Sequence, residues 1–179
     1  MIERKTYIQF GKSPDYSIDY LLGILEDARV TTIQRVENLS IDELHWQFEK
    51  GWNTIGVLLS HIISCEHFFR IHFIEGRTLT KQENQEYLPG LEMGKFIPNL
   101  ITDWSIDKYI TQLENSRLML IKEIEKLDTV AFQKKREGYN PNTGHNLAWT
   151  LYHLAEDEVH HRGQISIIRK LFKTIHNKI

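Results

Sequence analysis

The sequence lacks a second cysteine, a long apolar segment and an excess of charge of either sign. Its single cysteine, Cys65, excludes a disulfide within the chain and favours a reducing compartment, so we expect a cytoplasmic protein. No stretch approaches the roughly 18 consecutive apolar residues that a membrane-spanning helix needs. The first ten residues alternate charged and apolar side chains, so we also expect no secretory signal.

The charges are balanced and scattered along the chain. The 22 basic and 24 acidic residues give a formal net charge of -2, with no basic cluster that would indicate nucleic acid or an anionic membrane as a partner. There are no internal repeats, low-complexity tracts or interdomain linkers. We therefore expect one domain over residues 1–179, large enough to bury a core without a disulfide or a structural metal.

Four segments repeat apolar residues with the 3.6-residue period of a helix that buries one face. They span about residues 16–38, 54–75, 106–127 and 147–172. Most charged residues of the first segment, Arg29 among them, are assigned to its other faces. Four amphipathic helices in one domain predict an all-α four-helix bundle.

The connections carry polar residues and turn formers. Ser40 and Glu43 form a capping-box pattern before a short helical turn. Residues 76–98 show no sustained period, so we expect a long loop that crosses over between the second and third helices or covers a site. Residues 134–144 predict a polar turn that leads into the last helix.

The last helical segment has ionisable groups in the middle of its apolar face. Leucines and isoleucines recur on that face at both ends of the segment, but Asp157, Glu158 and His161 interrupt it. An unpaired carboxylate or imidazole is costly to bury, so such a pattern indicates that something satisfies these groups. A metal ion is the leading candidate.

The spacing of the candidate ligands supports a metal site. Asp157 and His161 are four residues apart and therefore lie one turn apart on the same helix. His61 is the one histidine outside the last helix that occupies a predicted core position of a helix. Ligation by His61, Asp157 and His161 would leave a coordination position open for water or substrate, and would suit zinc, nickel, manganese or iron. Glu158 is the candidate general base, with a surface ion pair to Arg162 as the alternative.

Several neighbouring residues have alternative interpretations. A lone core histidine is more often satisfied by a backbone carbonyl than by a metal. His160 is expected to lie at the surface or in helix packing, whereas His160 or His153 as an additional ligand would close the site. Cys65 is a ligand, a nucleophile or a small buried side chain. Gln164 either binds an anionic substrate or holds helix contacts, and Gly163 is expected to permit close helix approach.

Three motifs resemble those of the DinB-like superfamily of metalloenzymes. They are TIGVLLSHI at 54–62, LYHL at 151–154 and HHRGQI at 160–165. The resemblance implies a four-helix bundle, commonly a homodimer, with a divalent ion, often nickel or zinc, held by one histidine of the second helix and two of the fourth. By position, these ligands are His61, His161 and, where a histidine is usual, Asp157. The aspartate implies a site of altered affinity or metal preference, and the alternative is a member of the superfamily that has lost its metal.

The resemblance also implies an activity. Relatives include transferases that use low-molecular-weight thiols such as bacillithiol or mycothiol, in which the ion lowers the pKa of a thiol so that the thiolate attacks an electrophile. The partners would then be a small-molecule substrate and a thiol cofactor. The alternatives are a metal-dependent hydrolase with Glu158 as the base, and a non-catalytic metal-binding or dimeric interaction protein.

Overall fold

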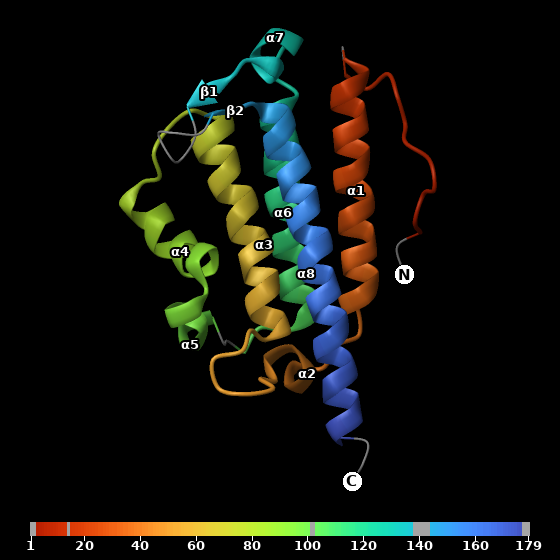
Figure 1. Ribbon diagram of the computed structural model, residues 1–179, viewed down its shortest axis with the longest axis vertical. Helices are drawn as coiled ribbons and strands as arrows, with labels where there is room; N and C mark the ends of the chain where they lie inside the picture. The colour runs from red at the N-terminus through yellow and green to blue at the C-terminus, as the bar shows by residue number, and fades with distance from the viewer. Residues whose placement is uncertain (1–2, 14, 101–102, 138–143, 177–179) are drawn as a thin grey trace.

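Four long helices lie side by side in a bundle (Figure 1). They are α1 (Tyr16–Val36), α3 (Ile55–Phe69), α6 (Ile106–Ile124) and α8 (Leu147–His176). The computed structural model describes residues 3–13, 15–100, 103–137 and 144–176. Helices α1 and α8 run in one direction, and α3 and α6 run in the other (Figure 1). The predicted all-α four-helix fold is confirmed.

Side-chain caps start α1 and the short helix that follows it. The Asp15 carboxylate accepts a hydrogen bond from the Ser17 amide at the start of α1. Ser40 and Glu43 form the expected capping box of α2 (Ile41–His45), which closes the end of the bundle between α1 and α3. Such caps satisfy amide groups that the first turn of a helix leaves without partners. At its other end α3 continues into a π-helical turn over Arg70–Ile74.

The segment between α3 and α6, which we expected to be a long loop over 76–98, is helical in part, so the expectation is wrong for residues 81–92. Helix α4 (Lys81–Glu92) packs on the outside of α3 and is followed by a 3-10 turn and by α5 (Ile97–Leu100) (Figure 1). A capping box of Thr80 and Glu83 starts α4. Half of its residues are exposed and Gly90 is its one buried residue, which explains why the sequence shows no sustained apolar period there.

The other end of the bundle carries short elements. Helix α7 (Thr129–Gln133) is followed by β1 (Arg136–Glu137) and β2 (Gly144–His145), which pair antiparallel with Arg136 opposite His145. Residues 138–143 of the predicted turn lie outside the described part of the chain. Within the described residues, no helix is both long and apolar enough to span a membrane.

The apolar core consists of two clusters. One contains Leu25, Leu120 and Leu151, and the other contains Leu58 and Ile165. Each of the four long helices contributes to both clusters. Buried charged residues lie between the two clusters on α1, α6 and α8, and on α3 the buried Glu66 directly follows Cys65 of the first cluster. The candidate site lies at the same level.

Candidate metal centre

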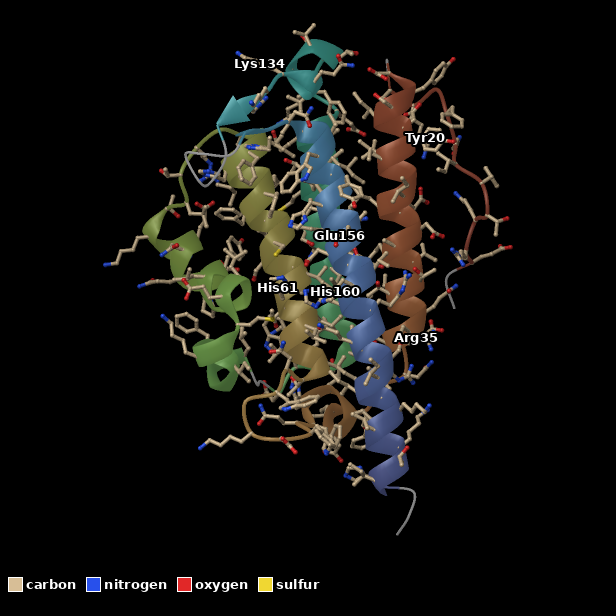
Figure 2. All side chains as sticks on the ribbon, in the orientation of Figure 1. Tyr20, Arg35, His61, Lys134, Glu156 and His160 are labelled. Atoms are coloured by element: carbon tan, nitrogen blue, oxygen red, sulfur yellow. The ribbon has the colours of Figure 1, made fainter. Side chains whose placement is uncertain are left out.

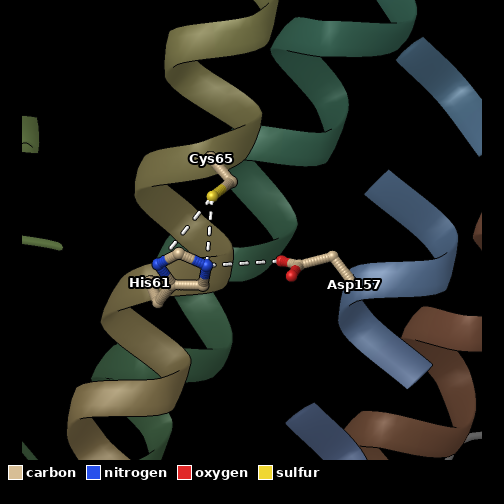
Figure 3. Close-up of side chains that lie close together, drawn as sticks. All are labelled: His61, Cys65 and Asp157. Carbon is tan, nitrogen blue, oxygen red and sulfur yellow. Dashed lines mark hydrogen bonds and ion pairs between the residues drawn. The ribbon is translucent and has the colours of Figure 1, made fainter. Parts of the chain in front are cut away.

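The structure brings together the three residues predicted as ligands. His61 of α3 faces Asp157 of α8, with 3.5 Å between His61 Nε2 and Asp157 Oδ2 (Figure 3). His161 lies one turn after Asp157, and its Nε2 is 3.3 Å from Asp157 Oδ1. The two imidazole rings are 4.8 Å apart between centroids. The Asp157 carboxylate therefore lies between two imidazoles, and metal ligation by the three residues stays a prediction.

Cys65 lies beside these three residues, and we call His61, Cys65, Asp157 and His161 together the cluster. Its Sγ lies 3.4 Å from His61 Nε2, one turn further along α3 (Figure 3). In the described part of the chain, donor atoms of His61, Cys65 and Asp157 form a group in which all lie within 4.8 Å of one another, close enough to hold one metal ion. Burial, together with the nearby carboxylates of Asp157 and Glu66, raises the pKa of the Cys65 thiol well above its ordinary value. In the metal-free protein Cys65 is therefore a neutral thiol.

Each histidine of the cluster is held through its other ring nitrogen. His61 Nδ1 lies 2.9 Å from the carbonyl oxygen of Gly90 in α4, and His161 Nδ1 lies 2.9 Å from Gln164 Oε1. Because a carbonyl oxygen only accepts hydrogen bonds, these contacts place a proton on Nδ1 and turn Nε2 of both rings toward Asp157. Metal-binding histidines are commonly oriented in this way.

Gly90 allows the backbone of α4 to approach α3 closely enough to contact His61. A Cβ atom at this position would lie 2.8 Å from the Ser60 carbonyl oxygen and 2.1 Å from Ser64 Oγ, both on α3. Only a residue without a side chain fits this approach. Helix α4 therefore does more than cover the site, because its backbone supplies the acceptor that orients His61.

Asp157 and His61 shift each other's pKa, and both side chains are partly exposed to solvent. Burial opposes the charge on Asp157, but hydrogen bonds from His161 and His61 hold the pKa of its carboxyl well below its ordinary value. Burial also opposes a charge on His61, whereas the Asp157 carboxylate and the Gly90 carbonyl raise its pKa above its ordinary value. The side chains of His61 and Asp157 are 13% and 20% exposed. The cluster is therefore largely buried, with some solvent contact at Asp157.

The family model of the DinB superfamily matches residues 24–165. The chain belongs to the DinB superfamily. The match covers more than half of the chain and includes α3 and most of α8, which carry the cluster. No curated protein matches the chain. The resemblance seen in the three motifs is thereby confirmed.

Glu158 does not lie in the cluster of this DinB-superfamily protein. Its side chain is 1% exposed and accepts hydrogen bonds from Arg29 and Arg117, so the expected surface pair with Arg162 is wrong. The Arg162 guanidinium instead donates to Thr31 Oγ1. Successive residues of a helix point about 100° apart, so Asp157 faces α3 while Glu158 faces the bundle interior. Its predicted role as a general base gains no support from this position.

Four buried charged residues form one network, which we call the charge layer. It consists of Arg29 in α1, Glu66 in α3, Arg117 in α6 and Glu158 in α8. Arg29 Nε lies 2.9 Å from Glu158 Oε1, and its Nη2 lies 3.1 Å from Glu66 Oε2. Arg117 Nε lies 2.5 Å from Glu66 Oε1, and its Nη2 lies 2.9 Å from Glu158 Oε2. Each arginine therefore bridges both glutamates.

The charge layer was missed in the sequence, although a signal is present. Arg29 follows the core residue Leu25 by four positions, and Glu66 follows Ile62 by four, so both lie in the register of the apolar face. The assignment of Arg29 to an outward face is wrong. A charged residue in core register on each of several helices indicates mutual pairing, because a buried charge needs a partner.

The other candidate residues lie at the edge of the cluster or away from it. His160 is exposed and lies 3.0 Å from Gln164 Nε2, at a height along the bundle similar to that of His61 (Figure 2). His153 stacks on Trp149 and contacts Glu156. Gly163 does not mediate close helix approach, because a Cβ atom there would meet nothing within 4 Å.

Proposed function

We propose that the cluster binds one divalent metal ion and that the protein is a metal-dependent enzyme. His61 Nε2, His161 Nε2 and the Asp157 carboxylate would hold the ion and leave a coordination position open for a substrate. Two imidazoles and one carboxylate suit zinc or nickel better than manganese, which prefers oxygen ligands. The observation that carries this proposal is the convergence of two Nδ1-anchored imidazoles on one carboxylate.

Thiol transfer is the reaction that we propose, on the basis of the resemblance to the DinB superfamily. An ion bound here would lower the pKa of a coordinated low-molecular-weight thiol, which would release its proton to water. The thiolate sulfur would then form a bond to an electrophilic carbon of the substrate as the bond from that carbon to its leaving group breaks and the group departs with the electron pair. The Gly90 carbonyl and Gln164 would keep the two imidazoles oriented during turnover. Hydrolysis would need a base to activate water, and Glu158, the candidate for that role, has both carboxylate oxygens engaged by arginines.

A non-catalytic metal site is the second candidate, and the position of Cys65 favours it. If Cys65 joined His61, Asp157 and His161 as a fourth ligand, the coordination shell of a zinc ion would be complete and no position would remain for a substrate. The bound ion would then stabilise the α3–α8 interface. The two candidates differ in whether Cys65 coordinates the ion.

Metal analysis tests the proposal. We expect about one equivalent of a divalent ion in untagged protein purified without a chelator, and a loss of most of it in His61→Ala and Asp157→Ala. His153→Ala is the matched control, because this histidine also lies on α8 but contacts Glu156 and Trp149. A wild-type protein that binds no stoichiometric ion after incubation with zinc or nickel would refute the proposal.

Cobalt substitution separates the enzyme from the non-catalytic site. If Cys65 is a ligand, the Co²⁺ form shows a thiolate-to-cobalt charge-transfer band that Cys65→Ser abolishes. If it is not, the spectrum keeps its form in Cys65→Ser, and the protein should consume a low-molecular-weight thiol in the presence of an electrophile. A four-ligand spectrum together with no thiol consumption would favour the non-catalytic candidate.

The proposal includes a homodimer. Tyr16, Tyr20 and Ile24 recur every four residues on α1 and are 71%, 53% and 40% exposed, an apolar stripe that a second copy would cover. Sedimentation equilibrium at micromolar concentration tests this state. A monomer under these conditions would contradict it without affecting the metal site.

A further inference from the structure

Two members of the metal-binding cluster directly precede two members of the charge layer. Cys65 is followed by Glu66 on α3, and Asp157 is followed by Glu158 on α8. Glu66 and Glu158 are held by the same two arginines, Arg29 and Arg117. The two arginines thus link α3 to α8 at positions directly next to a donor residue of the cluster on each helix.

The arginines also fix α1 and α6 reciprocally. Arg29 of α1 donates to the Leu113 carbonyl oxygen of α6. Arg117 of α6 donates to the Leu25 carbonyl oxygen of α1, at 2.6 Å. A guanidinium group is planar and presents its donors in a rigid fork, so each arginine constrains three helices at once. A sliding movement of α3 against α8 would break several of these hydrogen bonds together.

Net stabilisation does not by itself account for such a network. Removing four charges from water carries a desolvation cost that their mutual attraction roughly offsets, and well-packed apolar residues often do as well or better. What an ionic network provides, and an apolar layer does not, is a defined register between the elements that it joins. In this protein the register concerns the two helices that carry the cluster.

We propose that the charge layer is a positioning device that sets the separation of the α3 and α8 halves of the metal-binding cluster. Glu66 and Glu158 are positioning residues in this sense, since neither belongs to the cluster itself. The proposal rests on the proposed metal-binding function where affinity is concerned. It also makes a prediction for the metal-free protein, which does not depend on that function.

Shortening a glutamate of the layer by one methylene tests the proposal. Glu158→Asp and Glu66→Asp keep the charge but pull the carboxylate away from the arginines, so the affinity for zinc should fall about 10–100-fold, the usual effect of disturbing groups that support metal ligands. Phe132→Leu is the control, because Phe132 is buried in α7 at the end of the bundle. Phe132→Leu should lower the free energy of unfolding but leave the zinc affinity within about twofold of the wild-type value.

Replacing the whole charge layer by apolar residues distinguishes a positioning role from a purely stabilising one. The variant Arg29→Met/Glu66→Leu/Arg117→Met/Glu158→Leu should melt at or above the wild-type temperature yet bind zinc at least about tenfold more weakly. Wild-type affinity in this variant, or in both aspartate variants, would overturn the proposal. If the fourfold variant fails to fold, the two aspartate variants decide alone.

Histidine-selective NMR of the metal-free protein provides the readout that does not require an ion. The imidazole signals of His61 and His161 report their contacts with Asp157, so they should shift in Glu158→Asp and stay in place in Phe132→Leu. Unchanged signals in Glu158→Asp would overturn the proposal even if zinc binds. Shifted signals in a protein that binds no zinc would refute the metal function and leave the positioning role intact.

Discussion

Replacing Glu158 by glutamine tests how strongly the charge layer holds the four helices. The substitution keeps the side-chain volume but removes the charge that Arg29 and Arg117 share at distances of 2.9 Å each. Breaking a buried ion pair from one side costs about 3–5 kcal/mol, because the partner charges stay buried. At about 2–4 °C per kcal/mol for a chain of this size, the melting temperature should fall by roughly 6–20 °C.

The matched control lies on the same helix. Glu156 has a side chain that is 52% exposed and contacts His153 at 3.2 Å, so Glu156→Gln should change stability by no more than about 0.5 kcal/mol. Thermal and urea unfolding of both metal-free variants, followed by circular dichroism, gives the comparison. Equal losses in the two variants, or a loss below about 1 kcal/mol for Glu158→Gln, would show that the buried charges are not coupled as the distances indicate.

Three further predictions concern the cluster and its surroundings. Gly90→Ala should cost about 1–3 kcal/mol and weaken zinc binding in calorimetric titrations, because the new methyl would lie 2.8 Å from the Ser60 carbonyl oxygen and displace α4 from His61. Asp157→Asn should lower the free energy of unfolding of the metal-free protein, measured in urea, most between about pH 4 and pH 6.5, where Asp157 and His61 are both charged in the wild type. This difference should shrink as the pH rises through the raised pKa of His61, or falls through the lowered pKa of Asp157. His145→Phe should raise stability by about 1 kcal/mol, because neither ring nitrogen has a partner among the described residues. The gain should be larger at pH 5 than at pH 8, since burial lowers the pKa of His145; equal gains would contradict this reasoning.

The helices and the meeting of His61 with Asp157 could be predicted because they depend on local periodicity. An apolar stripe determines which face of a helix is buried, and a polar residue in that stripe must then lie in the interior. With only four long helices, inward-facing polar residues on two of them have few places to meet. The apolar stripes, the four-residue spacing and the family resemblance together therefore led to three residues that lie close together in the structure.

The partners of Glu158 could not be predicted in this way. Arg162 is four residues away on the same helix, whereas Arg29 and Arg117 belong to helices far away in the sequence. Which buried charges meet depends on helix order and rotation, and these follow from packing of the whole bundle. Helix α4 was missed for a related reason, since the contact of Gly90 with α3 involves a backbone and leaves no apolar pattern.

The charge layer also affects the order in which the chain can fold during synthesis. Before α8 has left the ribosome, Arg29 and Arg117 share only Glu66, so a bundle of α1, α3 and α6 would enclose an excess positive charge. The nascent chain should therefore stay open and solvated at this level until Glu158 arrives. The docking of α8 then neutralises the interior and delivers Asp157 and His161 to His61 in the same step.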